Sequence, residues 1–163
     1  MANYFHPSVK IAPFASIEIS SRGTDTHMGA NSGIDDFVKI KHIGGMGHIF
    51  IGNNVFINSC TVIYSGNGIK IGDNVLIGPN CNFVPTNHNF SNRNELINLQ
   101  GFQPSKGGIV IEDNVWLGAN VTVLDGAIIR SGCIIAANSL VIGETEEFGV
   151  YAGSPAKKIK SRI

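Results

Sequence analysis

The chain has 163 residues, enough for one domain that buries its own hydrophobic core. Its 12 basic and 12 acidic side chains give a formal net charge of zero, which argues against nucleic acid or an anionic membrane as the main partner. No apolar run approaches the roughly 20 residues of a membrane span, and no signal-peptide pattern opens the chain, so we expect a cytoplasmic protein.

Residues 1–50 carry a weak periodic pattern of apolar residues interrupted by prolines and glycines. This pattern predicts irregular N-terminal coils rather than regular repeats. Within it, residues 21–33 are polar and rich in glycine, which predicts a loop. Asp25 and His27 lie in this segment, where solvated side chains explain them more simply than a ligand site does.

From Ile51 the aliphatic residues recur every six positions, a period that no helix can use. Asn or Gly commonly stands three positions after each aliphatic residue, and these residue types accept a positive φ at little cost. Each hexad therefore predicts a short strand and a corner, with a face of about 20 Å for six residues. Three faces close one coil of a triangular prism, so the repeats predict a parallel β-helix, with regular hexads over 51–88 and 109–143.

Residues 89–108 lack the six-residue pattern, and hexads resume directly after them. The chain must therefore leave the prism and return, as an extruded loop of a length that is usually functional or disordered. His88 stands at the root of this loop. An imidazole fixed on a rigid wall beside a mobile loop suits proton transfer near neutral pH, and the simpler alternative is a satisfied polar residue at a loop base.

Residues 144–163 begin with an acidic turn and end in a basic tail that contains Lys157, Lys158, Lys160 and Arg162. We expect this short C-terminal tail to be helical. Its cations are either solvated or, if the tail lies near a neighbouring wall, able to hold phosphate groups as point charges.

Several motifs together resemble the hexapeptide-repeat acyltransferases, in the branch of the galactoside, maltose and polysaccharide O-acetyltransferases. The motifs are IGNNVF, IGDNVLIGPNC, the histidine at the root of a long loop, IEDNVWLGANVTV and the ending AGSPAK. Their order makes the match specific, and it covers the chain from Ile51 onward. The resemblance implies an all-β, left-handed parallel β-helix and a homotrimer with active sites between adjacent prisms. The left hand comes from the resemblance alone, because parallel crossovers are normally right-handed.

The resemblance also implies acetyl transfer from acetyl-CoA to a sugar hydroxyl without a metal. In that family the loop histidine is the general base, which here is His88, and an asparagine at the position of Asn58 binds the acceptor sugar. Trp116 matches a position near the pantetheine groove, although packing in a trimer interface explains it equally well. The remaining positions that match coenzyme A contacts are Ala119, Ala137, Lys157 and Lys160.

Two departures from the family affect the expected coenzyme A contacts and the expected acceptor. Ile142 and Gly143 stand where relatives carry a Thr-Lys pair, so one coenzyme A contact is missing or moved. The helical N-terminal segment of the galactoside and maltose enzymes is also lacking. This second departure favours a sugar of a surface polysaccharide, of lipopolysaccharide or of a nucleotide-linked precursor as the acceptor.

Three other functions remain open. An N-acetyltransferase of a nucleotide-linked amino sugar would use the same base and groove. A zinc-dependent hydratase of the carbonic anhydrase kind would need three histidines on adjacent faces, whereas His42 and His48 lie outside the regular hexads that His88 adjoins. A non-catalytic β-helix scaffold would explain the repeats but neither the loop histidine nor the basic tail.

Overall fold

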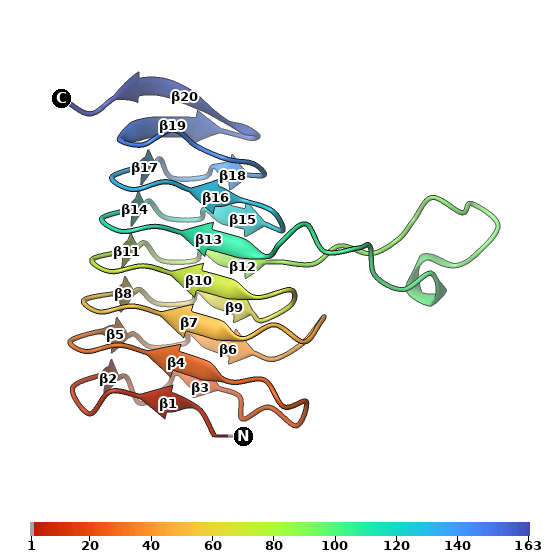
Figure 1. Ribbon diagram of the computed structural model, residues 1–163, viewed down its shortest axis with the longest axis horizontal. Coiled ribbons are helices and arrows are strands. Elements are labelled where there is room, and N and C mark those ends of the chain that lie inside the picture. The colour runs from red at the N-terminus through yellow and green to blue at the C-terminus, as the bar shows by residue number, and fades with distance from the viewer. Residues whose placement is uncertain (1) are drawn as a thin grey trace.

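The structure, a computed structural model that describes residues 2–163, is a three-sided solenoid with one long excursion (Figure 1). Sheet A contains β1 (Tyr4–Phe5), β4 (Thr26–Met28), β7 (Ile49–Ile51), β10 (Ile69–Ile71), β13 (Ile109–Ile111) and β16 (Ile128–Ile129). Sheet B contains β2 (Lys10–Ile11), β5 (Gly33–Ile34), β8 (Phe56–Ile57), β11 (Leu76–Ile77), β14 (Trp116–Leu117), β17 (Ile134–Ile135), β19 (Gly149–Gly153) and β20 (Ala156–Ser161). Sheet C contains β3 (Ser16–Ile17), β6 (Lys39–Lys41), β9 (Val62–Tyr64), β12 (Asn82–Val84), β15 (Thr122–Leu124) and β18 (Leu140–Val141).

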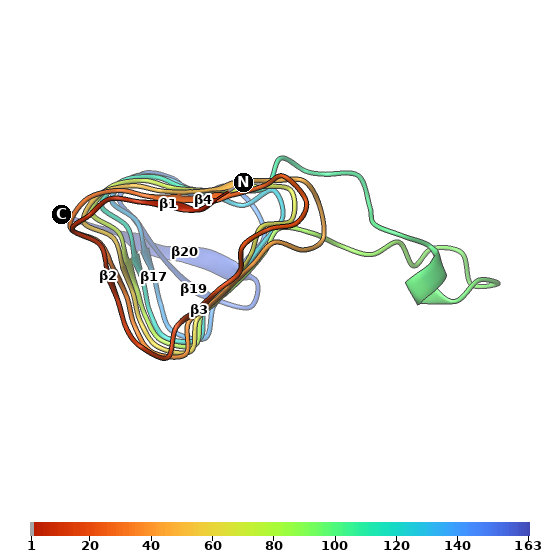
Figure 2. The same cartoon turned by 90° about the horizontal axis from the view of Figure 1, so that it is seen from below.

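The solenoid is left-handed. Successive strands visit sheets A, B and C in turn, and all neighbours within a sheet are parallel except β19 and β20. Figure 2 views the prism from its N-terminal end, and there the chain runs anticlockwise from β1 through β2 and β3 to β4 as it recedes. An anticlockwise receding path is a left-handed helix. The predicted fold class, an all-β left-handed parallel β-helix with one extruded loop, is confirmed.

The hexad aliphatic residues form the core, as the sequence predicted. Ile111, Leu117, Val123, Ile129 and Ile135 are buried, with exposed fractions of 0% or 1%. Register pairing places Leu117 on Ile77 and Ile135 on Leu117, so each face stacks its own aliphatic ladder along the prism. Burial of these ladders is the main stabilising contribution in such a stack, because each coil covers the apolar edge of its neighbour.

The predicted corners are confirmed by backbone geometry. Asn54, Asn74 and Asn114 have φ values of 55°, 58° and 58°, and the same left-handed conformation recurs at Asn120 and Asn138 with 59° and 61°. Asparagine tolerates this region better than other residues with a side chain. The side chains also stack, since Asn120 Nδ2 donates to Asn138 Oδ1 at 3.1 Å.

The N-terminal coils are more regular than the sequence indicated. Strand β4 lies inside residues 21–33, which were predicted to form a loop, and it pairs in register with β7. The inward residues of β4 are Thr26 and Met28, where β7 has Ile49 and Ile51. Thr24 and Thr26 are 1% and 0% exposed, and their hydroxyls hydrogen-bond the two ring nitrogens of His42 at 2.9 and 3.1 Å. This buried polar network replaces only the other inward position of the strand, because Met28, Ile34 and Ile40 are buried and continue the six-residue ladder.

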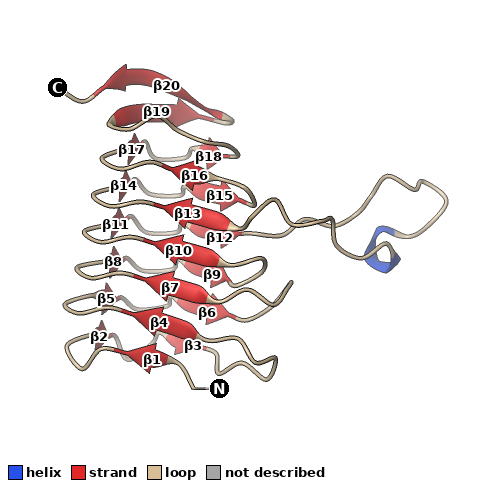
Figure 3. Cartoon of the chain, in the orientation of Figure 1, coloured by secondary structure: helices blue, strands red, loops and turns tan. Residues whose placement is uncertain are grey.

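The prediction of a helical C-terminal tail is wrong. The tail folds as β19 and β20, an antiparallel pair that continues sheet B beyond β17 (Figure 3). The open edge of β17 offers backbone hydrogen-bond partners that a helix could not use, and Tyr151 of β19 completes the inward ladder at 8% exposure. Within residues 2–163, no helix has the length and apolar character that a membrane span requires.

Candidate active site

A strip of small residues follows the strands of sheet B, at the corner between sheets B and C that we call the BC corner. The strip begins at Asn58 and continues through Gly78, Gly118 and Ala136, each donating its backbone N–H to the coil above. A Cβ on Gly118 would lie 2.6 Å from the backbone nitrogen of Ala137, so the coils approach closely here. Small residues therefore follow one another at successive rungs along this prism edge.

Four of the residues that the family resemblance singled out lie along this corner. Ala119 and Ala137 occupy adjacent rungs, because Asn138 N donates to Ala119 O at 2.9 Å. Lys157 of β20 pairs with Ala152 of β19, which extends the corner toward the C-terminal end. Asn58 lies toward the other end, and its Nδ2 donates to Ile77 O at 2.7 Å, which holds the amide against the strand end.

Trp116 and Lys160 lie on sheet B itself. Trp116 is an outward residue of β14, 52% exposed and in register with Leu76 and Ile134. Lys160 pairs with Val150 one strand beyond β17. Lys158 makes an ion pair with Glu146 at 2.6 Å, and the hydrogen bond to that carboxylate raises its pKa. Within residues 2–163 no carboxylate forms an ion pair with Lys160.

His88 lies at a different corner, between sheets C and A, where the chain leaves β12. The loop begins with a two-stranded stem, in which Gln103 N donates to Asn87 O at 2.8 Å and Asn89 N donates to Gly101 O at 2.9 Å. The stem sets His88 opposite Phe102, with ring centroids 4.6 Å apart. The exposed imidazole borders a concavity of about 540 Å³ that is also lined by Glu95, Leu96, Ile97 and Asn98.

Asp125 anchors the returning end of the loop, a role that sequence reasoning missed. It follows β15 at the same corner as His88 and is 5% exposed. Its carboxylate accepts hydrogen bonds from Lys106 N at 2.8 Å, from Gly108 N at 2.9 Å and from Asn67 Nδ2 at 3.1 Å. In the sequence, an acidic residue at a predicted corner suggests a solvated side chain. Only its position next to the returning end of the loop could have indicated that it holds the loop in place, a role that we call the loop clamp.

The single chain does not bring all predicted site residues together. Asn58, Ala119, Ala137 and Lys157 share the BC corner, whereas His88 belongs to the loop at the corner between sheets C and A. Figure 2 shows this loop extending away from the prism, with the BC corner at the far end of sheet C. The loop also carries exposed apolar side chains. Ile97 and Leu99 belong to the 3-10 turn η1 (Ile97–Leu99), and Leu96 directly precedes it. These three side chains are 58–69% exposed.

The remaining histidines form local contacts on the N-terminal coils. Asp25 Oδ1 accepts from His48 Nδ1 at 2.5 Å and from His27 Nε2 at 3.1 Å, and the hydrogen bond from His48 is the main cause of its lowered pKa. His42 is buried, which lowers its pKa. Across residues 2–163, no group of three or more His, Cys, Asp or Glu side chains is arranged to hold a metal ion.

Comparison with known proteins supports the fold and the repeat. Residues 108–143 match the family model "Bacterial transferase hexapeptide (six repeats)", and residues 68–86 match "Hexapeptide repeat of succinyl-transferase". The solved structure of a point mutant of AntD, an N-acyltransferase from Bacillus cereus in complex with dTDP-4-amino-4,6-dideoxyglucose and coenzyme A, superposes with a TM-score of 0.82 at 25% identity. That superposition covers 99% of this chain and 84% of the AntD chain.

Curated relatives include two proteins of Escherichia coli (strain K12). "Putative lipopolysaccharide biosynthesis O-acetyl transferase WbbJ" is 37% identical over 121 residues, which is 71% of this chain and 62% of that protein. Galactoside O-acetyltransferase is 31% identical over 117 residues, which is 69% of this chain and 54% of that protein. The chain thus spans somewhat more than half the length of these relatives.

The repeats, the prism and the extruded loop define a hexapeptide-repeat protein of the left-handed β-helix class. With these matches, the chain is a hexapeptide-repeat protein that is similar to proteins named acetyltransferases.

Proposed function

We propose that this protein transfers the acetyl group of acetyl-CoA to a hydroxyl of a sugar, in the synthesis of a surface polysaccharide or lipopolysaccharide. The observation that carries the proposal is an exposed imidazole, His88, fixed by a loop stem in a fold whose BC corner is lined by small residues. The similarity to proteins named O-acetyltransferases supports it. We place the reaction in the cytoplasm, where acetyl-CoA is available.

The BC corner suits coenzyme A. Gly118, Ala119 and Ala137 keep the corner free of bulky side chains, so an extended pantetheine chain can lie along it. Lys157 and Lys160 near the C-terminal end would pair with phosphates as point charges. Trp116 would then flank the BC corner on sheet B and pack against the pantetheine.

His88 would act as the general base. Its neutral imidazole takes the proton of the acceptor hydroxyl while that oxygen attacks the thioester carbonyl carbon of acetyl-CoA. The tetrahedral intermediate collapses, the carbon–sulfur bond breaks, and the departing thiolate takes the proton from the imidazolium. Asn58 would hold the acceptor sugar beside this centre. The residues so placed need no metal ion for the transfer.

The site would be shared between subunits of a homotrimer. His88 follows β12, in the same coil as β11, and Asn58 follows β8 in the adjacent coil, so both lie at a similar height on opposite ends of sheet C. Prisms set side by side around a three-fold axis would bring the loop of one subunit to the BC corner of the next. The exposed Leu96, Ile97 and Leu99 would then be covered.

A second candidate is N-acetylation of a nucleotide-linked amino sugar. The structural similarity to AntD, whose structure contains dTDP-4-amino-4,6-dideoxyglucose and coenzyme A, favours it. An amine acceptor would use the same base and the same BC corner. The two candidates differ only in the atom that attacks the thioester.

The test is thioester loss from acetyl-CoA, measured against a panel of sugars, nucleotide sugars and amino sugars. We expect sugar-dependent turnover that falls by about 10²-fold or more in His88→Ala, because general-base catalysis contributes an effect of this size. His6→Ala, a change at an exposed histidine of the first coil, serves as the matched control and should leave turnover unchanged. Undiminished turnover in His88→Ala, or failure of coenzyme A to bind the wild type, contradicts the proposal.

A further inference from the structure

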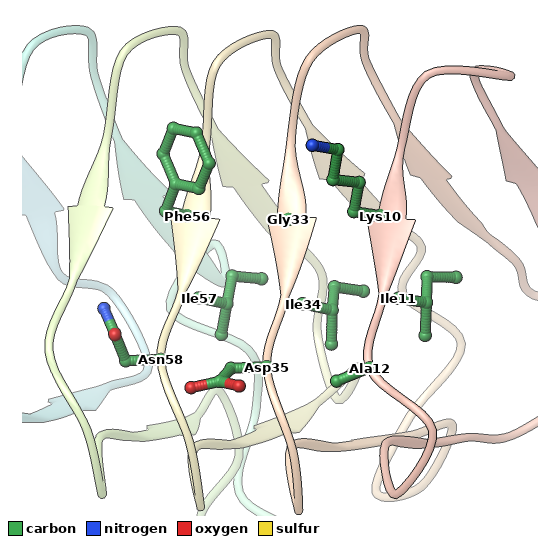
Figure 4. Close-up of a pocket in the computed structure, with 9 residues that line it drawn as sticks. All are labelled: Lys10, Ile11, Ala12, Gly33, Ile34, Asp35, Phe56, Ile57 and Asn58. Carbon is green, nitrogen blue, oxygen red and sulfur yellow. The ribbon is translucent and has the colours of Figure 1, made fainter.

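A groove crosses the N-terminal strands of sheet B, on the N-terminal side of the residues proposed to hold coenzyme A. The outward positions of β2, β5 and β8 are Lys10, Gly33 and Phe56, which pair in register. Since Gly33 has no side chain, a gap separates the other two, as Figure 4 shows. Neighbouring strands lie roughly 4.8 Å apart, so the gap spans about 10 Å between strand axes. The groove has a volume of about 380 Å³.

Polar groups stand at the BC end of this groove. Asp35 and Asn58 lie two residues beyond Gly33 and Phe56 along their strands and line the same groove (Figure 4). The Asp35 carboxylate accepts from Asp36 N at 2.8 Å and from Ser59 Oγ at 2.9 Å. The bond from Asp36 N is the main cause of the lowered pKa of Asp35, so the carboxylate stays ionised at neutral pH and fixed in position.

We infer that this groove binds the acceptor as a hexose that carries a phosphate on its anomeric carbon. The Phe56 ring packs against the apolar face of the sugar, Asp35 and Asn58 accept and donate hydrogen bonds with its hydroxyls, and the Lys10 ammonium pairs with the phosphate. The inference rests on the proposed function through Asn58, the residue that the groove shares with the proposed reaction centre.

The dimensions and charges of the groove carry the assignment. Phe56 is 49% exposed, so one ring face is open to a ligand, and apolar faces of sugars pack well on such rings. Gly33 and Asp35 lie two residues apart, about 6.6 Å along the strand, which is close to the length of one hexose ring. No carboxylate within residues 2–163 forms an ion pair with Lys10. The groove therefore has a free cation at one end and a fixed anion at the other.

Gly33 determines whether the groove exists. A Cβ at this position would lie 3.2 Å from the Phe56 ring, so a larger side chain fills the gap and displaces the ring. The backbone of Gly33 does not adopt a positive φ, so a substitution there leaves the strand conformation available. Gly33→Val is therefore a variant that should fold and lose the groove.

Binding is tested by amide NMR of the full-length protein with glucose 1-phosphate, glucose and inorganic phosphate as probes. We expect saturable shifts of the Gly33 and Asp35 amides with glucose 1-phosphate, at an affinity about tenfold or more above that for glucose. UDP-glucose as a further probe distinguishes a nucleotide-linked acceptor, which should bind more tightly, from a free sugar phosphate. Equal affinities for glucose and glucose 1-phosphate overturn the phosphate assignment, and shifts that map elsewhere overturn the site.

Matched variants complete the experiment. Phe56→Ala and Gly33→Val should each weaken glucose 1-phosphate binding by about tenfold or more, whereas Phe50→Ala, at a phenylalanine 48% exposed on sheet A, should not. Lys10→Ala should abolish the preference over glucose, and Lys70→Ala on sheet A should retain it. If Gly33→Val binds glucose 1-phosphate as tightly as the wild type, the groove assignment is refuted while the proposed transferase activity is not. Failure of acetyl-CoA to bind while the sugar phosphate still binds refutes the proposed transferase activity instead.

Discussion

Replacement of Asp125 by alanine should release the returning end of the loop that carries His88. The carboxylate accepts three hydrogen bonds at 2.8, 2.9 and 3.1 Å and is 5% exposed. Hydrogen bonds to a charged group contribute about 1.5–3 kcal/mol each, but water can replace the partner of the exposed Lys106. We therefore expect Asp125→Ala to lower the free energy of unfolding by about 2–4 kcal/mol, mainly through the buried N–H of Gly108.

The control for this prediction is Asn67→Ala, which removes one of the three donors and leaves both backbone bonds to the carboxylate. It should cost about 1 kcal/mol, measured like Asp125→Ala by urea denaturation. Since a displacement of about 1 Å at a reacting group can cost 10²-fold in rate, Asp125→Ala should also reduce sugar-dependent turnover while coenzyme A affinity stays unchanged. Stability and turnover that both match the wild type would refute the clamp.

Three further predictions concern the prism. Burial lowers the pKa of His42 below its ordinary value of 6.5, so the unfolded chain binds more protons than the folded protein in mildly acid solution. The free energy of unfolding should therefore fall as the pH falls through 6.5, by at most about 1.4 kcal/mol per pH unit. In urea titrations at several pH values, His42→Gln should lose this dependence. A Cβ on Gly47 would clash with the backbone of Gly68, so Gly47→Ala should destabilise by about 2 kcal/mol or more in the same assay, while Gly143→Ala, with nothing within 4 Å, should be neutral. Phe83→Ala empties a fully buried position and should lower the thermal midpoint through a loss of about 3–5 kcal/mol, and a loss below 1 kcal/mol would contradict the packing.

The core and corners could be predicted because each hexad repeats one local rule. Ile111 and Leu117 follow the aliphatic period, and Asn114 supplies the positive φ between them. The second coil obeys the same geometry and keeps the six-residue period at Met28, Ile34 and Ile40, but Thr26 stands where β7 has Ile49, and its hydroxyl bonds His42. A buried polar pair carries no periodic signal until its partner is known.

The C-terminal tail and the loop clamp depend on contacts that local sequence does not encode. Strand β20 forms because β19 presents an open edge, which is a property of the completed stack and not of residues 156–161. Asp125 binds Gly108 across 17 residues, and only the path of the loop brings them together. The sequence could single out His88 and Ala137, whereas their assignment to two different corners required the order of strands around the prism.

The separation of these two corners gives a quantitative test of the shared site. His88→Ala removes the proposed base, and Ala137→Trp would block the proposed coenzyme A site at an exposed position, so each variant alone should be inactive. Suppose that every site takes its base from one subunit and its coenzyme A contacts from the next. When equal amounts of the two variants assemble at random, about one site in four has an intact His88 from one subunit and an intact Ala137 from its neighbour, and general-base catalysis returns at these sites. Co-refolded mixtures should then recover about a quarter of wild-type turnover, with mixed oligomers verified by mass-tagged subunits. A site contained within one chain would recover nothing, because each subunit in the mixture carries one of the two defects.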